Sequence, residues 1–244
     1  ANDIAYHLDK INRKYDNLIN VLGADHTGYI KRISAGVSAL SDKKVKLNCK
    51  VCQLVKLYKN GKPFKMSKRA DDFISVQDLL DEVNKDSIRF MMLNRSNDVE
   101  LDFDFEKVKE KSKDNPVFYV QYAFARINSI IRSLKKNLTD EILVDPKSFN
   151  PNKYEEKIIR KIFQWPKIIE SAAYKLEPHK IPFYLYELST LFHSYWSKGN
   201  EDSNFKFIEN GKVKRMESLI FIYLIAIVVK NGMNILGVSL PEKM

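Results

Sequence analysis

Hydrophobic positions near the N-terminus switch between helical and strand-like spacing. Residues 4–14 carry apolar side chains at helical intervals. The apolar run 18–22 stops at Gly23, as a buried strand of a parallel sheet does, and helical spacing returns over 28–40. Strand, glycine-containing turn and helix together predict one unit of a doubly wound α/β sheet. Because such sheets bind ligands beyond the carboxyl ends of their strands, segment 23–26 is the first candidate site.

The next predicted feature is a β-hairpin. Residues 51–58 have a strand-like pattern and precede the Asn60-Gly61 pair, which tolerates positive φ and favours a tight turn. The return strand leads into a basic segment at 65–69. Beyond it, residues 76–83 have amphipathic helical spacing, and 88–93 form another compact apolar segment.

Helical spacing dominates from residue 113 onward. Asp114-Asn115-Pro116 predicts a helix start, with a capping side chain before a proline at the first helical position. Three further helical patterns follow at 154–174, 182–196 and 213–231, and Pro166 is expected to kink or split the first of them. We therefore predict an α/β domain over 1–112 and an all-α bundle over 113–244.

Composition adds a charge imbalance to this picture. The 244 residues are 44% hydrophobic and 30% charged, as in soluble globular proteins. The 41 Lys and Arg residues outnumber the 31 Asp and Glu residues, for a net charge of +10. Such an excess favours a polyanionic partner, because neutralised phosphates release counterions. A solvated basic surface is the equally supported alternative.

Cysteine content and hydropathy restrict the class of protein further. Cys49 and Cys52 make half of a tetrahedral zinc site with no second pair, so we predict free thiols, buried or half-buried, and no protein-bound metal. The lack of a disulfide framework suits the cytoplasm. The most apolar run, 219–229, has about 11 residues, fewer than the ~20 of a membrane span. It predicts a buried core helix and no membrane association.

The basic segment Lys65-Met66-Ser67-Lys68-Arg69 can neutralise a triphosphate, whose leaving pyrophosphate gains negative charge in the transition state. On composition alone, an exposed basic turn is the simpler interpretation. The string, however, resembles the KMSKS signature of class I aminoacyl-tRNA synthetases, with Arg69 in place of the final serine. Four more segments resemble arginyl-tRNA synthetases in the family's order, and these are 3–7, 23–29, 115–123 and 232–238. The resemblance extends over about 1–244.

This resemblance implies a fold and a reaction. The fold would be the second half of a class I Rossmann-like catalytic domain with a KMSKS-type loop, followed by a helical, DALR-type anticodon-binding domain. The reaction would be that of an arginine–tRNA ligase, which activates L-arginine with ATP and Mg²⁺ and transfers it to arginine-accepting tRNA. Positioning and charge stabilisation would carry the catalysis, rather than a covalent protein nucleophile. The full-length enzyme would be cytoplasmic and monomeric.

Carried over by position, the resemblance also assigns site residues. Those facing the nucleotide and arginine would be Asp3, Gly23, Asp25, His26 and Met66. Those contacting the phosphates during catalysis would be Lys65, Ser67 and Lys68. Asp3 would receive the substrate guanidinium, because a carboxylate offers bidentate acceptor geometry. Taken alone, Asp3 and Asp25 are also explained as helix caps, and His26 as a local hydrogen-bond partner.

A second set of residues would contact tRNA from the helical half. They are Tyr119, Gln121, Tyr122 and Arg126. Aromatic faces stack on unpaired bases, and arginine contacts a phosphate or a base edge. At helical spacing, one or two of these tyrosines are also expected in the core. A basic cluster at the end of the same helix would help either RNA binding or the helix dipole, and it consists of Arg132, Lys135 and Lys136.

Two departures from the family pattern limit the expected activity. The His-Ile-Gly-His signature is absent, and Thr27 stands where a second histidine is common. We therefore expect this chain to lack half of the ATP site and not to charge tRNA alone. The alternative hypothesis is a non-catalytic tRNA- or RNA-binding module. A His-Ile-Gly-His segment upstream in the gene would favour the ligase, whereas translation starting near Ala1 would favour binding alone.

Overall fold

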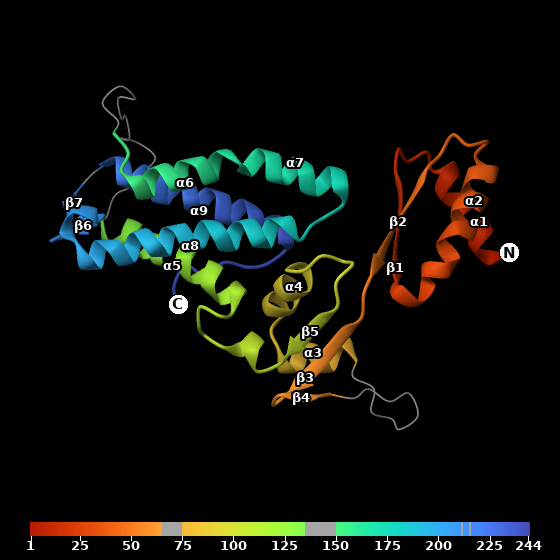
Figure 1. Cartoon of the computed structure of the whole chain (residues 1–244), viewed down its shortest axis with the longest axis horizontal. Helices are drawn as coiled ribbons and strands as arrows, with labels where there is room; N and C mark the ends of the chain where they lie inside the picture. The colour runs from red at the N-terminus through yellow and green to blue at the C-terminus, as the bar shows by residue number, and fades with distance from the viewer. Residues whose placement is uncertain (65–74, 135–149, 211, 215) are drawn as a thin grey trace. The chain divides into compact units, whose positions relative to one another are not determined.

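The computed structural model describes residues 1–64, 75–134, 150–210, 212–214 and 216–244. The chain divides into two compact units (Figure 1). The first contains residues 1–57 and 95–103, and the second contains 58–94 and 104–244. The predicted helical half thus lies within the second unit, together with the segments 58–94 and 104–112.

The first unit confirms the predicted α/β pattern. Its elements are α1 (Asn2–Asn12), β1 (Leu18–Gly23), η1 (Ala24–Tyr29), α2 (Ile30–Leu40) and β2 (Leu47–Cys52). β1 and β2 pair in parallel, from Leu18 opposite Leu47 to Gly23 opposite Cys52. Side chains from the two strands form a small core with Ile33 and Val37 of α2. Period-2 alternation therefore turns one face of β1 toward the helix, while Val21 on the other face is 69% exposed.

The strand predicted over 51–58 is two strands. β2 ends at Cys52 and β3 (Val55–Lys59) begins after a two-residue break. The break exists because the backbone changes partner: Gln53 N–H donates to the Asn97 carbonyl. Beyond it, β3 lies between β4 (Lys62–Pro63) and β5 (Leu101–Asp104) in a three-stranded sheet.

The predicted hairpin is confirmed between β3 and β4. Asn60 and Gly61 have φ values of +53° and +70°, and Lys59 pairs with Lys62 across the two-residue loop. Both central residues therefore adopt the positive φ that a type I′ turn requires. Two short helices follow, α3 (Val76–Glu82) and α4 (Lys85–Leu93).

The second half forms the predicted helical bundle. Its helices are α5 (Pro116–Ser133), α6 (Lys153–Phe163), α7 (Trp165–Lys175), α8 (Lys180–Glu201) and α9 (Met216–Leu236). The predicted helix over 154–174 is split at Gln164, which caps the end of α6 and the start of α7. This is expected, because Pro166 has no backbone N–H to continue the helical hydrogen bonds. Fully buried side chains such as Leu188 and Phe192 of α8 and Ile222 of α9 form one core with α5.

The predicted cap of α5 is only partly right. Asn115 occupies the N-cap position and Pro116 the first turn, but the Asn115 side chain makes no capping hydrogen bond. Its amide instead donates to the carbonyls of Val108 and Glu110, at 3.0 and 2.7 Å. Asn115 therefore fixes the loop that enters the bundle rather than the first turn of the helix.

The apolar stretch of α9 is longer than the predicted 219–229. Segment Glu217–Leu236 has a mean hydropathy of 2.0, so by length and composition alone it is long enough to cross a membrane. Within the structure, 56% of its most apolar window is buried, and Leu219, Ile222 and Val229 are fully buried in the bundle core. The position of α9 is that of a core helix. The polar residues at 230–231 had shortened the predicted run.

A buried carboxyl group ties three of these helices together. Glu155, in the first turn of α6, is fully buried. Its Oε1 accepts hydrogen bonds from Tyr195 of α8 at 2.8 Å and Ser218 of α9 at 2.9 Å. Its Oε2 accepts from the Asn152 backbone N–H at 2.9 Å, which completes a capping box. One side chain therefore satisfies donors from two neighbouring helices and from its own cap.

Candidate nucleic-acid interface

The structure places Gly23, Asp25 and His26 at the carboxyl end of β1, where the α/β pattern predicted a site. A Cβ at Gly23 would lie 2.7 Å from Asp25 Oδ1, so a larger residue there would displace the Asp25 carboxylate from its place beside the strand end. His26 Nε2 lies 3.6 Å from Asp25 Oδ2, and both side chains are largely exposed. No side chain caps η1 or α2, so Asp25 does not act as a helix cap.

Asp3 is linked to the same segment through Tyr29. Asp3 lies in the first turn of α1 and does not cap it. Its carboxylate lies near Tyr29, the last residue of η1, and its carbonyl accepts from His7 Nδ1–H at 2.7 Å. Loss of water contact, hydrogen bonding to Asp3 and the Asp3 charge together raise the pKa of Tyr29. The first unit thus joins Asp3 to the helix that carries Asp25 and His26.

The predicted phosphate-contacting residues lie outside the described residues. They are Lys65, Ser67 and Lys68, and Met66 of the predicted nucleotide- and arginine-facing set lies outside them as well. Lys135 and Lys136, the basic residues predicted after α5, lie outside them too. Within the described ranges, no group of three or more His, Cys, Asp or Glu residues is arranged to hold a metal ion.

In the second unit, α5 and α8 present a layer of aromatic rings around an arginine. The Tyr122 ring stacks on His193 at a centroid distance of 5.7 Å and an interplanar angle of 21°. The Tyr119 ring also packs against His193, at a centroid distance of 4.4 Å and an interplanar angle of 44°. Tyr186 continues the layer, with its ring 5.1 Å from that of Tyr119. Two predicted tRNA contacts are thus brought together by a histidine that the sequence did not single out.

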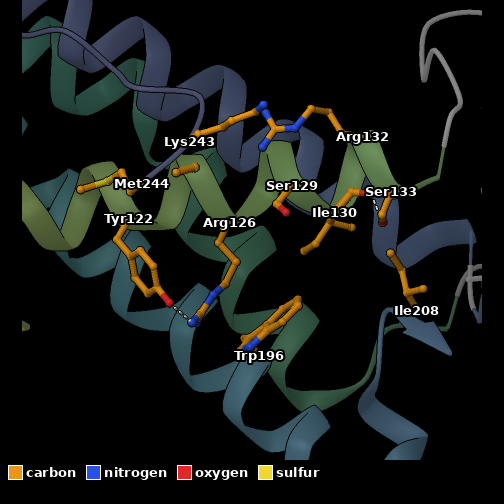
Figure 2. Close-up of a pocket in the computed structure, with 11 residues that line it drawn as sticks. Tyr122, Arg126, Ser129, Ile130, Arg132, Ser133, Trp196, Ile208, Lys243 and Met244 are labelled. Carbon is orange, nitrogen blue, oxygen red and sulfur yellow. Dashed lines mark hydrogen bonds between the residues drawn. The ribbon is translucent and has the colours of Figure 1, made fainter. Parts of the chain in front are cut away.

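Arg126 lies between two aromatic rings in this layer. Its guanidinium carbon is 4.4 Å from the Tyr122 ring centroid and 5.0 Å from that of Trp196, and its Nη2 donates to the Tyr122 hydroxyl at 2.5 Å (Figure 2). The ring quadrupoles attract the cation and hold its plane in place. Because the side chain is only half-buried, this fixed guanidinium remains accessible to a partner.

His193 is held as a neutral imidazole. Its Nε2–H donates to the Tyr119 carbonyl at 3.3 Å, which leaves Nδ1 to accept from Arg126 Nη1 at 3.4 Å. Burial is the main cause that lowers the pKa of His193 to about 4. The hydrogen bond to the Tyr119 carbonyl acts to raise this pKa, whereas the Arg126 charge acts to lower it. The signal that could have found His193 is the aromatic run Phe192-His193-Ser194-Tyr195-Trp196 within the predicted helix.

The stability of the helical unit should depend on pH through His193. The pKa of this group is about 4 in the folded protein, and it is about 6.5 in an unfolded chain. As pH falls through this window, the unfolded chain takes up a proton that the folded state excludes. We therefore expect the free energy of unfolding to fall by up to about 3 kcal/mol between about pH 6.5 and 4.

Urea denaturation followed by tryptophan fluorescence measures this loss, because the two tryptophans, Trp165 and Trp196, both belong to the bundle. A His193→Gln variant, which cannot take up the proton, is the control. An equal loss of stability on acidification in the variant would contradict the prediction.

Beside Arg126 the surface is hollowed into a groove of about 680 Å³, here called the first groove. Figure 2 shows its walls: α5 supplies one, Trp196 of α8 and Ile208 the opposite side, and the C-terminal tail the rim. The α5 residues in it are Tyr122, Ala125, Arg126, Ser129, Ile130, Arg132 and Ser133. Arg132 also donates to the Glu242 carbonyl at 2.9 Å, which holds the tail carrying Lys243 and Met244 at the rim.

The remaining predicted tRNA contacts point elsewhere. Gln121 Nε2 donates to the Ser239 carbonyl at 2.9 Å and so fixes the tail against α5. Tyr119 lines a second hollow, of about 520 Å³, between α6 and α8. The first groove therefore contains Tyr122 and Arg126 of the predicted set.

The groove lies in a part of the chain that matches a known family. Residues 120–244 match the DALR anticodon binding domain. The chain belongs to this family. All lining residues of the first groove, from Tyr122 to Met244, fall within the DALR domain.

Whole-chain comparisons extend the match beyond the DALR domain. The chain is 58% identical to the arginine–tRNA ligase of Pelagibacter ubique and 49% identical to that of Ruegeria pomeroyi. All of this chain aligns, and it spans only 42% and 43% of those relatives' lengths. The predicted resemblance to arginyl-tRNA synthetases is thereby confirmed.

Solved structures support the fold on both sides of the DALR boundary. A putative arginyl-tRNA synthetase from Campylobacter jejuni superposes with a TM-score of 0.85 at 31% identity, covering 99% of this chain and 51% of that one. The Thermus thermophilus arginyl-tRNA synthetase matches with a TM-score of 0.68 at 20% identity over 95% of this chain and 42% of that one, a likeness of fold. These matches confirm the predicted fold class, an α/β part followed by a helical anticodon-binding part.

Proposed function

We propose that this chain is part of an arginine–tRNA ligase and that its DALR domain binds the anticodon loop of arginine-accepting tRNA in the first groove. The observation that carries the proposal is Arg126, fixed between Tyr122 and Trp196 at the wall of the groove. An unpaired base can stack on an aromatic ring there, while the guanidinium contacts a phosphate or a base edge. Whole-chain identity of up to 58% to arginine–tRNA ligases supports it.

In the same proposal, the first part of the chain contributes to arginine activation by ATP. Asp3 would accept the substrate guanidinium, and Gly23, Asp25 and His26 would face the bound nucleotide and amino acid. Lys65, Ser67 and Lys68 would contact the phosphates, with Met66 packing beneath them, and Mg²⁺ would accompany ATP. The placement of Gly23, Asp25 and His26 at a strand's carboxyl end supports this role for the first part, for which we propose an end at about residue 112.

The complete enzyme would hold these groups in position and stabilise the charge that develops on pyrophosphate, without a covalent protein intermediate. We further propose that this enzyme is cytoplasmic and monomeric. Helix α9 lies in the core of the helical unit, which is consistent with that setting.

The proposal predicts binding without charging for the 244-residue chain alone. We expect it to bind arginine-accepting tRNA but to release no pyrophosphate when arginine, ATP and tRNA are supplied, since the His-Ile-Gly-His half of the ATP site is not in its sequence. Filter binding and a pyrophosphate-release assay measure the two properties. A pyrophosphate-release rate near that of a full-length arginine–tRNA ligase would contradict the expectation that this chain cannot activate arginine alone. Absence of tRNA binding would contradict the role of the first groove.

A further inference from the structure

The hollow between α6 and α8, here called the second groove, has the composition of a nucleotide site. Its volume is about 520 Å³, within the usual range for sites that bind small organic ligands. Aromatic rings, hydroxyl groups and lysines line it, among them Tyr119, Lys157, Ser194, Ser197 and Lys198. Glu201, which pairs with Lys198, also lines it. No step of the proposed function so far uses this groove.

The two grooves share a wall made of stacked rings. Tyr122 lines the first groove and Tyr119 the second, and His193 lies against both rings. The two tyrosines are three residues apart on α5, so they are neighbours along one face of that helix. A single RNA strand can therefore present one base to each groove by separating two unpaired nucleotides across His193.

The Tyr119 ring is held ready for stacking. Tyr186 and His193 pack against the ring, which remains half-exposed. Burial raises the pKa of its hydroxyl, with hydrogen bonding to Thr190 acting against it. Because the ring is immobilised before a base arrives, stacking on it costs little side-chain entropy.

The two lysines of the second groove differ in their surroundings. Lys198 pairs with Glu201 at 3.0 Å. Lys157 is exposed on α6, and among the residues that the structure describes it makes no ion pair. An ammonium group that makes no ion pair is available to a phosphate, while the exposed hydroxyls of Ser194 and Ser197 can bond a sugar or a base edge.

We infer that the second groove binds an unpaired nucleotide of the same RNA loop that occupies the first groove, with its base on Tyr119 and a phosphate on Lys157. This inference rests on the proposed function, because the first groove must hold the loop. The ligand is a single-stranded ribonucleotide, and no covalent step is involved.

A photo-crosslinking experiment on the intact protein tests the placement. The photoreactive residue p-benzoylphenylalanine replaces Ser197 in the second groove or, separately, Ser129 in the first groove, and arginine-accepting tRNA is the probe. We expect both proteins to crosslink to the anticodon loop, at different nucleotides. Crosslinking from position 129 but not from position 197 would overturn the second site alone. No crosslink from either position would overturn the proposed function as well.

A charge substitution tests the site without a bulky probe. We expect Lys157→Ala to weaken tRNA binding and to make the slope of log affinity against log salt concentration shallower by about 0.7, the value for one phosphate contact to a single strand. Lys167→Ala is the matched control, since it removes an equally exposed lysine from α7. Equal slopes for the two variants would overturn the assignment of Lys157, whatever the behaviour of first-groove variants.

Discussion

Replacing Glu155 with alanine is expected to lower the free energy of unfolding of the helical unit by about 3–5 kcal/mol. The side chain is fully buried and accepts hydrogen bonds from Tyr195, Ser218 and the Asn152 backbone. Its removal leaves these buried donors without their acceptor, and each such group costs about 1–3 kcal/mol. The capping box of α6 is lost at the same time, at about 1 kcal/mol.

Urea denaturation followed by tryptophan fluorescence measures this change, and two further variants serve as comparisons. Glu156→Ala removes the neighbouring carboxylate of the same helical turn, which is exposed, and should change stability by less than about 0.5 kcal/mol. Glu155→Gln keeps the shape but puts an amide donor against existing donors, so an intermediate loss is expected. A loss for Glu155→Ala no larger than that for Glu156→Ala would show that the buried network contributes nothing.

The second large effect concerns RNA. We expect Arg126→Ala in the intact protein to reduce affinity for arginine-accepting tRNA by about 10–100-fold, the range for an arginine that anchors an interface. The substitution removes the cation at the groove and also the group that holds the Tyr122 hydroxyl and lies over Trp196. Affinity and fold are measured on the same protein samples, by tRNA binding and by urea denaturation.

Charge alone does not explain the expected loss, and two controls separate charge from geometry. Arg160→Ala removes the same charge from an exposed position on α6, so it should weaken binding only through counterion release. Arg126→Lys keeps the charge but lacks the planar fork that stacks on both rings, so most of the loss should persist. Full affinity in the lysine variant would show that the guanidinium plane is not what binds.

Local pattern was sufficient for most elements of secondary structure. The parallel strand at 18–22, the Asn60-Gly61 hairpin and the split at Pro166 follow from side-chain periodicity, positive-φ tolerance and a missing amide hydrogen. The break between β2 and β3 was not predicted, because it depends on a backbone partner at Asn97, far away in the sequence. The capping hydrogen bond predicted for the Asn115 side chain is absent for a similar reason, since its amide donates to two carbonyls of the preceding loop instead of capping its own helix.

The sequence by itself determined the family and the α/β-then-helical order, because these follow from the order of segments and the residue types along the chain. It named Tyr122 and Arg126 only as two of four predicted tRNA contacts. Only the tertiary structure decided how the predicted tRNA residues divide. Gln121 holds the tail, Tyr119 lines a second groove, and His193 and Trp196 of α8 complete the wall around Arg126. Packing of α5 against α8 sets these contacts. No periodicity within one helix specifies which ring of another helix it meets.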